Sequence, residues 1–182
     1  MNRKVIIIGP AFPYRGGIAN FNNSLAVEYK KQGADVKVYS FSLQYPSFLF
    51  PGKTQYEKGN PPKDIEIEQI VNSINPFNWF KISRKIKKEN PDYVIIRYWL
   101  PFMAPCLGTI AKLINTKIKV FAITDNIIPH EKRLGDAILT KYFVSKCTAF
   151  LALSSSVLDD LSKFTKTNNK IFIPHPIYDS FG

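Results

Sequence analysis

The chain of 182 residues has only two cysteines and no long apolar run. Cys106 and Cys147 are too few for a disulfide framework, or for a metal site without further ligands. The longest apolar stretch, 98–111, contains two prolines and is too short and broken for a transmembrane helix. No signal-peptide pattern is present at the N-terminus. We therefore expect a metal-free, cytoplasmic protein, with peripheral attachment to the inner face of a membrane left open.

Acidic residues are also scarce, since 14 Asp and Glu stand against 25 Lys and Arg, a net charge of +11. Such an excess favours an anionic partner, such as a phosphorylated ligand or an acidic membrane surface. No nucleic-acid-binding motif accompanies the charge, so nucleic acid is not expected as a partner. The apolar content of 45% excludes a disordered chain, and the length suits a single domain, residues 1–182.

The common nucleotide-binding and hydrolase fingerprints are missing as well. The sequence contains no GxGxxG, no GxxxxGK[ST] and no GxSxG. These absences argue against a dinucleotide site, a P-loop and a serine hydrolase. A nucleotide-binding enzyme of another Rossmann-like class is the weakest of the interpretations that we consider.

What is present is an alternation of short apolar runs with segments of helical length. The expected strands are 4–9, 35–39, 65–67, 93–96, 118–123, 149–153 and 170–173. The expected helices are 18–32, 77–89, 103–114, 134–146 and 155–163. This alternation predicts an α/β fold with a Rossmann-like, doubly wound, mainly parallel sheet of about seven strands. The aromatic and proline-rich segment 42–63 interrupts it and is expected to be a functional loop.

A glycine loop joins the first expected strand, 4–9, to the first expected helix. It ends in Gly16 and Gly17, and two adjacent glycines let the backbone approach a ligand closely. The N-terminus of the helix adds a partial positive charge at the same place. The loop is therefore either an anion-binding site or a simple strand-to-helix turn.

A polar cluster, 124–133, follows the expected strand 118–123 and should lie at its carboxyl end, where open α/β sheets bind ligands. Arg97, at the end of another expected strand, should face the same edge. The candidates within the cluster are Asp125, Asn126, His130 and Glu131. Such side chains bind sugar hydroxyls or transfer protons, whereas the alternative is a loop whose polar groups cap its own backbone.

Two helices carry features with both a structural and a functional interpretation. Ser154 precedes the expected helix 155–163, where it either caps the helix or contributes to the ligand edge. The expected helix 77–89 has an aromatic and aliphatic face and a basic face. It either packs on the sheet as a plain solvated helix, or also lies on anionic lipid with its aromatic face inward or in the interface. We favour packing as its main role.

Six segments then occur in a characteristic order. They are Gly16-Gly17, ADVKV at 34–38, NPDYVII at 90–96, DNIIPHE at 125–131, LSSSVLDDL at 153–161 and IPHPIYD at 173–179. In this order and spacing they resemble the N-terminal half of a glycosyltransferase of family 4, an enzyme with the GT-B fold. The resemblance covers nearly the whole chain. Asp125 stands where many relatives have a histidine.

The resemblance implies transfer of a sugar from a nucleotide sugar to an acceptor, with retention of anomeric configuration and without a cofactor. It implies that the donor phosphates are faced by Arg15, Gly16 and Gly17. The catalytic roles fall to Asp125, His130 and Glu131. The acceptor contacts fall to Asn126, Arg97, Tyr45 and Ser154.

The resemblance also implies a C-terminal domain that binds most of the donor and that this chain lacks. That domain is expected as a partner in cis or in trans, so the chain alone is expected to be inactive. The acceptor is expected to be a glycan or a lipid-linked sugar. The alternative is a non-catalytic binding or membrane-recruitment module with a Rossmann-like fold.

Overall fold

The computed structural model describes residues 3–46, 55–129, 131 and 133–174. The strands are β1 (Lys4–Ile8), β2 (Asp35–Leu43), β3 (Glu66–Asn72), β4 (Tyr93–Tyr98), β5 (Lys119–Thr124), β6 (Ala149–Ala152) and β7 (Lys170–Phe172). The helices are α1 (Gly17–Lys31), α2 (Pro76–Glu89), the short 3-10 helix η2 (Pro101–Met103), α3 (Ala104–Ile114), α4 (Asp136–Val144) and α5 (Ser155–Ser162). The alternation expected from the sequence is confirmed.

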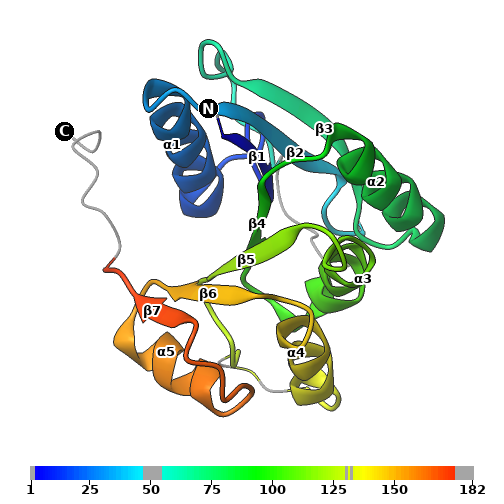
Figure 1. Ribbon diagram of the computed structural model, residues 1–182, viewed down its shortest axis with the longest axis vertical. Coiled ribbons are helices and arrows are strands. Elements are labelled where there is room, and N and C mark those ends of the chain that lie inside the picture. Colours follow the sequence, from blue (N-terminus) through cyan, green and yellow to red (C-terminus); the bar gives the residue numbers. More distant parts are fainter. Residues whose placement is uncertain (1–2, 47–54, 130, 132, 175–182) are drawn as a thin grey trace.

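All seven strands form one parallel sheet in the order β3-β2-β1-β4-β5-β6-β7. The chain starts in the middle, moves outward to β3, returns to β4 and then moves to the other edge (Figure 1). The Rossmann-like, doubly wound architecture predicted from the sequence is therefore correct. Right-handed crossovers place helices on opposite faces when the chain moves in opposite directions.

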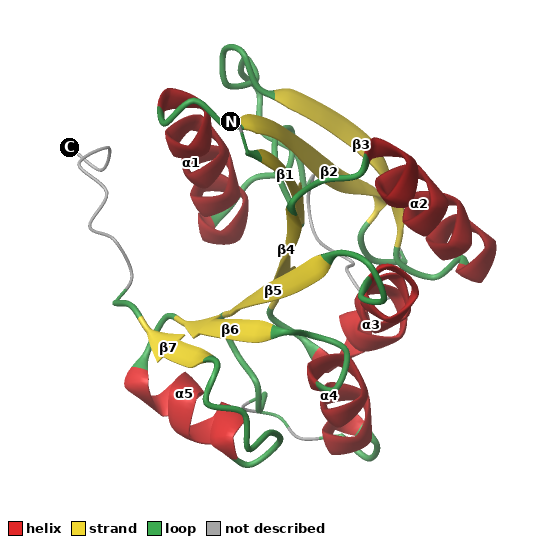
Figure 2. Cartoon of the chain, viewed as in Figure 1, coloured by secondary structure: helices red, strands yellow, loops and turns green. Residues whose placement is uncertain are grey.

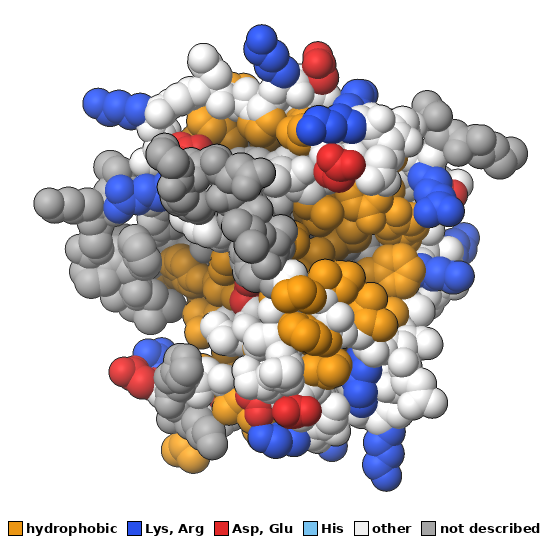
Figure 3. Space-filling model, turned by 90° about the vertical axis from the view of Figure 1, so that its left-hand side faces the viewer, with side chains coloured by type: hydrophobic (Ala, Val, Ile, Leu, Met, Phe, Trp, Pro, Cys, Tyr) orange, Lys and Arg blue, Asp and Glu red, His pale blue; other side chains and the backbone are white. Residues whose placement is uncertain are grey.

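The two faces of the sheet are covered unequally. Helices α2 to α5 follow one another along one face of the sheet (Figure 2). On the other face, α1 alone covers the sheet within the part of the chain that the structure describes. Beside α1 the sheet stays open over β4 to β7, where an apolar hollow of about 530 Å³ is lined by Phe121, Leu151 and Ile171 among others. Figure 3 looks at this side and shows apolar side chains gathered around the hollowed area. Parallel sheets normally bury both faces, so this face is incomplete in the described residues.

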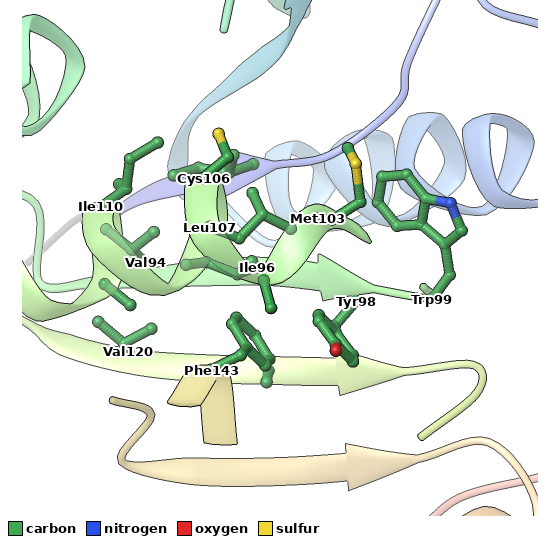
Figure 4. Close-up of a cluster of buried hydrophobic side chains, with 14 of the residues drawn as sticks. Val94, Ile96, Tyr98, Trp99, Met103, Cys106, Leu107, Ile110, Val120 and Phe143 are labelled. Carbon is green, nitrogen blue, oxygen red and sulfur yellow. The ribbon is translucent and has the colours of Figure 1, made fainter. Parts of the chain in front are cut away.

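The larger core lies between the sheet and α3. Val94, Ile96 and Val120 point from β4 and β5 toward Leu107 and Ile110 of α3 (Figure 4). These five side chains are fully buried. Close packing at this interface fixes α3, and with it the η2 turn that precedes α3 at the carboxyl end of β4.

Two details differ from the sequence-based expectation. Strand β2 continues to Leu43 and β3 extends from Glu66 to Asn72, because the two strands pair along their length with register shifts near Phe41. The interrupting segment is therefore 44–65, as long as the expected 42–63 but shifted by two residues along the chain. Its residues 47–54 lie outside the described part of the chain.

The second difference concerns the rotation of α2. Its N-terminus is capped, since the Asn75 side chain accepts hydrogen bonds from the backbone N–H groups of Phe77 and Asn78. However, the aromatic residues do not all face inward. Trp79 packs toward the core, whereas Phe77 and Phe80 are exposed on the side of the basic residues.

A network of charges ties the end of α2 to β2 and β3. Glu89 accepts a hydrogen bond from the Tyr39 hydroxyl and lies 3.4 Å from the amines of Lys37 and Lys85. These lysines also pair with Glu66 and Glu68 of β3. Burial alone would raise the pKa of the Glu89 carboxyl, but the Tyr39 hydrogen bond and the two lysines outweigh it, so the pKa lies below its ordinary value.

We expect Glu89→Gln to lower the free energy of unfolding by about 1–3 kcal/mol at neutral pH, since it removes a charged hydrogen-bond acceptor from a nearly buried network. The pKa of this carboxyl is lower in the folded than in the unfolded chain. Its contribution is therefore complete above about pH 4.3 and is lost as the pH falls through the lowered pKa. Urea unfolding of both proteins at neutral and acidic pH measures the difference.

The matched control for this prediction is Glu28→Gln. Glu28 also pairs with a lysine, Lys31, but both side chains are more than half exposed. That substitution should change stability by less than about 0.5 kcal/mol. Equal effects of the two substitutions, or a Glu89→Gln effect that grows at acidic pH, would contradict the interpretation.

Candidate functional site

The candidate site lies at the carboxyl edge of the sheet, where three connections meet. Ile8 pairs with Ile96, and Tyr98 pairs with Thr124, so the central strands β1, β4 and β5 end at similar heights. The segments that leave these strands, 9–17, 99–103 and 125–136, therefore lie at one edge. The backbone N–H of Asp125 donates to the Tyr98 carbonyl and extends this alignment. This is the edge that the sequence indicated.

The glycine loop forms one wall of a hollow of about 300 Å³, the glycine hollow. Its lining includes Arg15, Gly16, Gly17, Tyr45, Gln55 and Trp99. Gly16 has a φ of 111°, which L side chains rarely adopt, and no side chain caps the helix that follows. The first bond of that helix runs from the N–H of Asn20 to the Gly16 carbonyl.

The N-terminus of α1 is suited to a bound anion. The N–H groups of residues 17–19 have no acceptor within the helix, and the helix dipole is positive at this end. A Cβ built on either Gly16 or Gly17 would meet no atom within 4 Å, so the loop faces open space. The three residues predicted to face donor phosphates, Arg15, Gly16 and Gly17, all line this hollow.

A second hollow of about 360 Å³, the aromatic hollow, adjoins the first. Its lining includes Tyr45, Pro101, Phe102, Glu131, Arg133 and Asp136. It combines an apolar platform from the end of β4 with charged groups from the segment that enters α4. The Asp136 carboxylate accepts a hydrogen bond from the backbone N–H of Arg133. Glu131 forms no hydrogen bond or ion pair with the described residues.

Tyr45 is shared by both hollows. Its hydroxyl accepts a hydrogen bond from Trp99 Nε1 at 2.6 Å, and its ring lies 5.9 Å from that of Phe102, measured between centroids. Trp99 in turn packs edge-on against Phe41. The side chain of Tyr45 therefore forms a fixed partition, so that a ligand in one hollow lies next to a ligand in the other.

Arg97 and Asp125 form a buried ion pair beneath this edge. Arg97 is 1% exposed, and its Nε donates to an Asp125 carboxylate oxygen at 2.6 Å while Nη2 donates to the other. The guanidinium also lies 4.1 Å from the centre of the Phe21 ring, a cation–π geometry. Both residues were predicted as site residues, and the structure joins them to each other rather than to either hollow.

Gly9 is required by this pair. A Cβ on Gly9 would lie 2.9 Å from the Arg97 Cβ and 2.6 Å from the Asn22 side-chain nitrogen. That nitrogen donates to the Pro10 carbonyl, which fixes the start of the glycine loop. The buried pair and the glycine loop are thus held by the same neighbours.

The remaining residues that were predicted for the site do not line either hollow within the described part of the chain. Ser154 caps α5, because its hydroxyl accepts from the N–H of Val157 at 3.2 Å, and it lines neither hollow. Asn126 is exposed at the same edge and lines neither hollow. His130 lies outside the described residues. Among the described residues, no cluster of three His, Cys, Asp or Glu could hold a metal ion.

Sequence reasoning missed Phe102 and Asp136, and it included Arg133 only as a member of the polar cluster 124–133. The signal was present, since all three follow strands at the carboxyl edge. Their side chains meet Tyr45 in the aromatic hollow only because the chain is folded. In the sequence, Tyr45 lies 57 positions before Phe102.

The comparisons with known proteins concern the family and the fold of the chain. The family model described as "Glycosyltransferase Family 4" matches residues 15–179. The chain belongs to glycosyltransferase family 4. No curated protein sequence is significantly similar to it. Its family and its fold identify it as an N-terminal, Rossmann-like domain of the GT-B type.

Several solved structures have a similar fold. One is the apo form of the lipopolysaccharide outer core galactosyltransferase WaaB, with a TM-score of 0.66, 15% identity, and coverage of 96% of this chain and 46% of that one. A UDP-N-acetylglucosamine 2-epimerase from Rickettsia bellii has a TM-score of 0.61, 14% identity, and coverage of 94% and 44%. An α-glucosyltransferase in complex with UDP and DNA has a TM-score of 0.57, 11% identity, and coverage of 85% and 38%.

At these identities the likeness concerns the fold alone. The chain spans less than half the length of each of these solved structures. None of the helices in the described ranges has the length and apolar character needed to cross a membrane.

Proposed function

We propose that this domain is the acceptor-binding half of a retaining glycosyltransferase, which transfers a sugar from a nucleotide sugar to a glycan or lipid-linked acceptor. The observation that carries the proposal is the pair of adjoining hollows that share Tyr45. One hollow offers backbone N–H groups and a helix dipole to an anion. The other offers an aromatic platform and charged side chains, a combination that suits a sugar.

In this proposal the acceptor occupies the aromatic hollow, with one hydroxyl directed toward the glycine hollow. The acceptor oxygen bonds to the anomeric carbon of the donor sugar on the same face from which the bond to the diphosphate breaks, so that the anomeric configuration is retained. The hydroxyl proton leaves to a base, and the diphosphate departs with added negative charge. The N-terminus of α1 would stabilise that charge, because its N–H groups are already oriented toward the hollow.

Roles for individual residues follow from their places. Glu131 lies in the aromatic hollow without a partner among the described residues, so we assign it contact with the reacting hydroxyl, together with His130. Asp125 has both carboxylate oxygens bound by Arg97. We therefore propose that Asp125 positions the loop 125–131, and that Asn126 and Ser154 contact only the outer part of a long acceptor.

The proposal includes a second domain that binds the nucleotide, in the same chain or in a partner. The open apolar face of β4 to β7 supports it, since a helix of that domain would complete the second layer of the sheet. The lengths of the solved relatives support it as well. Without that domain we expect no sugar transfer, whereas acceptor binding should remain.

The glycine loop allows a sharp test, because Gly17→Ala should separate function from stability. Gly17 is the first residue of α1, where alanine is at least as favourable as glycine, so stability should be unchanged. The added methyl group enters open space at the loop and should displace a donor phosphate, which lowers the transfer rate about 10²-fold. The measurement is sugar transfer after the domain is joined to its donor-binding partner, alongside thermal unfolding.

The matched control is Gly59→Ala, whose Cβ would make only an ordinary contact with Phe12, at 3.9 Å. It should change neither quantity. Full transfer activity of Gly17→Ala would show that the loop is a simple turn. Failure of the isolated domain to bind any glycan or lipid-linked sugar would argue against acceptor binding and favour a non-catalytic module.

A further inference from the structure

The exposed side of α2 carries an unusual combination of side chains. Ile74, just before the helix, is 49% exposed, Phe77 is 86% exposed and Phe80 is 50% exposed. The exposed cations of the same helix are Lys81, Arg84, Lys87 and Lys88. We call these three apolar residues and four cations the α2 patch.

Helix geometry places the members of the patch together. Residues three, four and seven positions apart lie on one side of a helix, so Phe77 shares a side with Lys81, Arg84 and Lys88. The opposite stripe, Trp79, Ile82, Ser83 and Ile86, faces the protein. The two aromatic rings and the cations therefore point away from the core in the same direction.

This rotation of α2 is fixed by its inner side. Trp79 Nε1 donates to the Asn72 carbonyl at 2.7 Å, and the side-chain nitrogen of Asn78 donates to the Ile70 carbonyl at 2.8 Å. Ile82 and Ile86 are fully or almost fully buried. Turning the helix to bury Phe77 would break these contacts, so the exposure of Phe77 and Phe80 belongs to the folded domain.

The cations of the patch are available to a partner. Lys85, on the flank of the helix, is bound by Glu68 and Glu89. In contrast, no acidic side chain in the described ranges pairs with Lys81, Arg84, Lys87 or Lys88. A surface that joins exposed aromatic side chains to unpaired cations offers two contributions to binding at a membrane interface, burial of apolar area and attraction to anionic lipid.

The patch reaches the edge that carries the candidate site. Helix α2 follows β3, so its N-terminal end, with Ile74 and Phe77, lies at the carboxyl edge of the sheet. Helix α4, two places along the same layer (Figure 1), begins at the same edge. Beside its start Leu134 is fully exposed and Ile138 is 74% exposed, next to two residues of the aromatic hollow, Arg133 and Asp136.

We propose that α2 docks the domain on the surface of a bilayer that contains anionic phospholipid. Phe77 and Phe80 enter the interface between headgroups and acyl chains, and the four cations contact lipid phosphates. The net charge of +11 attracts the domain to such a surface before the rings insert. In this orientation the N-terminal end of α2, and with it the carboxyl edge of the sheet, lies beside the membrane surface, which places the aromatic hollow within reach of a lipid-linked molecule.

The test is flotation of the purified domain with vesicles of phosphatidylcholine alone or mixed with phosphatidylglycerol. Binding should require phosphatidylglycerol and weaken with added salt. The double variant Phe77→Ser and Phe80→Ser should lower the partition coefficient about tenfold or more while its circular dichroism stays unchanged. Lys81→Gln with Arg84→Gln should lower it by about fivefold for each charge removed.

The matched control removes two exposed cations from α1, with Lys30→Gln and Lys31→Gln, and should retain most of the binding. The proposal is overturned if the domain does not float with phosphatidylglycerol vesicles, if the serine variant floats as well as the parent, or if the control loses as much binding as Lys81→Gln with Arg84→Gln. A dimer in sedimentation that depends on Phe77 and Phe80, without vesicle binding, would also overturn it. The assay contains no sugar, so its result does not depend on the proposed transferase function.

Discussion

Replacing Arg97 by methionine is expected to lower the free energy of unfolding by about 3–5 kcal/mol. The guanidinium is buried, is bound by both carboxylate oxygens of Asp125, and stacks on Phe21. Its removal leaves the carboxylate of Asp125, whose side chain is only 17% exposed, without a countercharge. Urea unfolding followed by circular dichroism measures the loss.

The double variant, Arg97→Met with Asp125→Leu, distinguishes the cost of an unpaired buried charge from the contribution of the ion pair itself. Removing both charges leaves no unpaired ion, so much of the lost stability should return. The double variant should nevertheless disturb the loop 125–131, because its first residue loses the side-chain contact with β4 and keeps only the backbone hydrogen bond to Tyr98. A cost below about 1 kcal/mol for Arg97→Met would contradict the buried ion pair.

The second large effect is expected from Glu131→Gln in the enzyme completed by a donor-binding domain. If Glu131 accepts the proton of the reacting hydroxyl, the amide should lower kcat by about 10²–10⁴-fold. The substitution keeps the shape of the side chain, and Glu131 is exposed, so stability should not change. Acceptor binding by the domain alone should change far less than kcat.

A matched control is Glu57→Gln, which removes one exposed carboxylate from a place that lines neither hollow. It should leave kcat unchanged. Full activity of the Glu131→Gln enzyme would contradict the assignment and would indicate that another group of the site accepts the proton. A variant that loses acceptor binding and kcat equally would indicate a binding role for Glu131 instead.

Most of the fold follows from local patterns. Val5 to Ile8 form a run that is apolar at every position, which suits a strand covered on both sides, and β1 is indeed buried from Val5 onward. The dipeptide Asn75-Pro76 marks the start of α2 for a physical reason, because the Asn75 side chain accepts hydrogen bonds from two backbone N–H groups of the first turn. Such signals involve neighbours in the chain, so a sequence displays them directly.

The site was predicted less completely, because its parts come from distant segments. The sequence located Arg97 and Asp125 at one edge, but it did not show that they bind each other. That pairing depends on the register of β4 against β5, which sets Arg97 beside Ile123, two residues before Asp125. Likewise, Tyr45 meets Phe102 and Trp99 only when the segment after β2 lies over the end of β4.

The sequence by itself determined the order of the strands along the chain, the parallel sheet, the glycine loop at the N-terminus of α1 and the family resemblance. Each of these rests on residue type and spacing. Only the tertiary structure decided that Tyr45 joins two hollows, that Arg97 neutralises Asp125, and that Phe77 and Phe80 point outward with the cations of α2. Register, helix rotation and burial result from the packing of the whole domain, in which a contact such as that of Trp79 with Asn72 selects one of several arrangements that the local pattern permits.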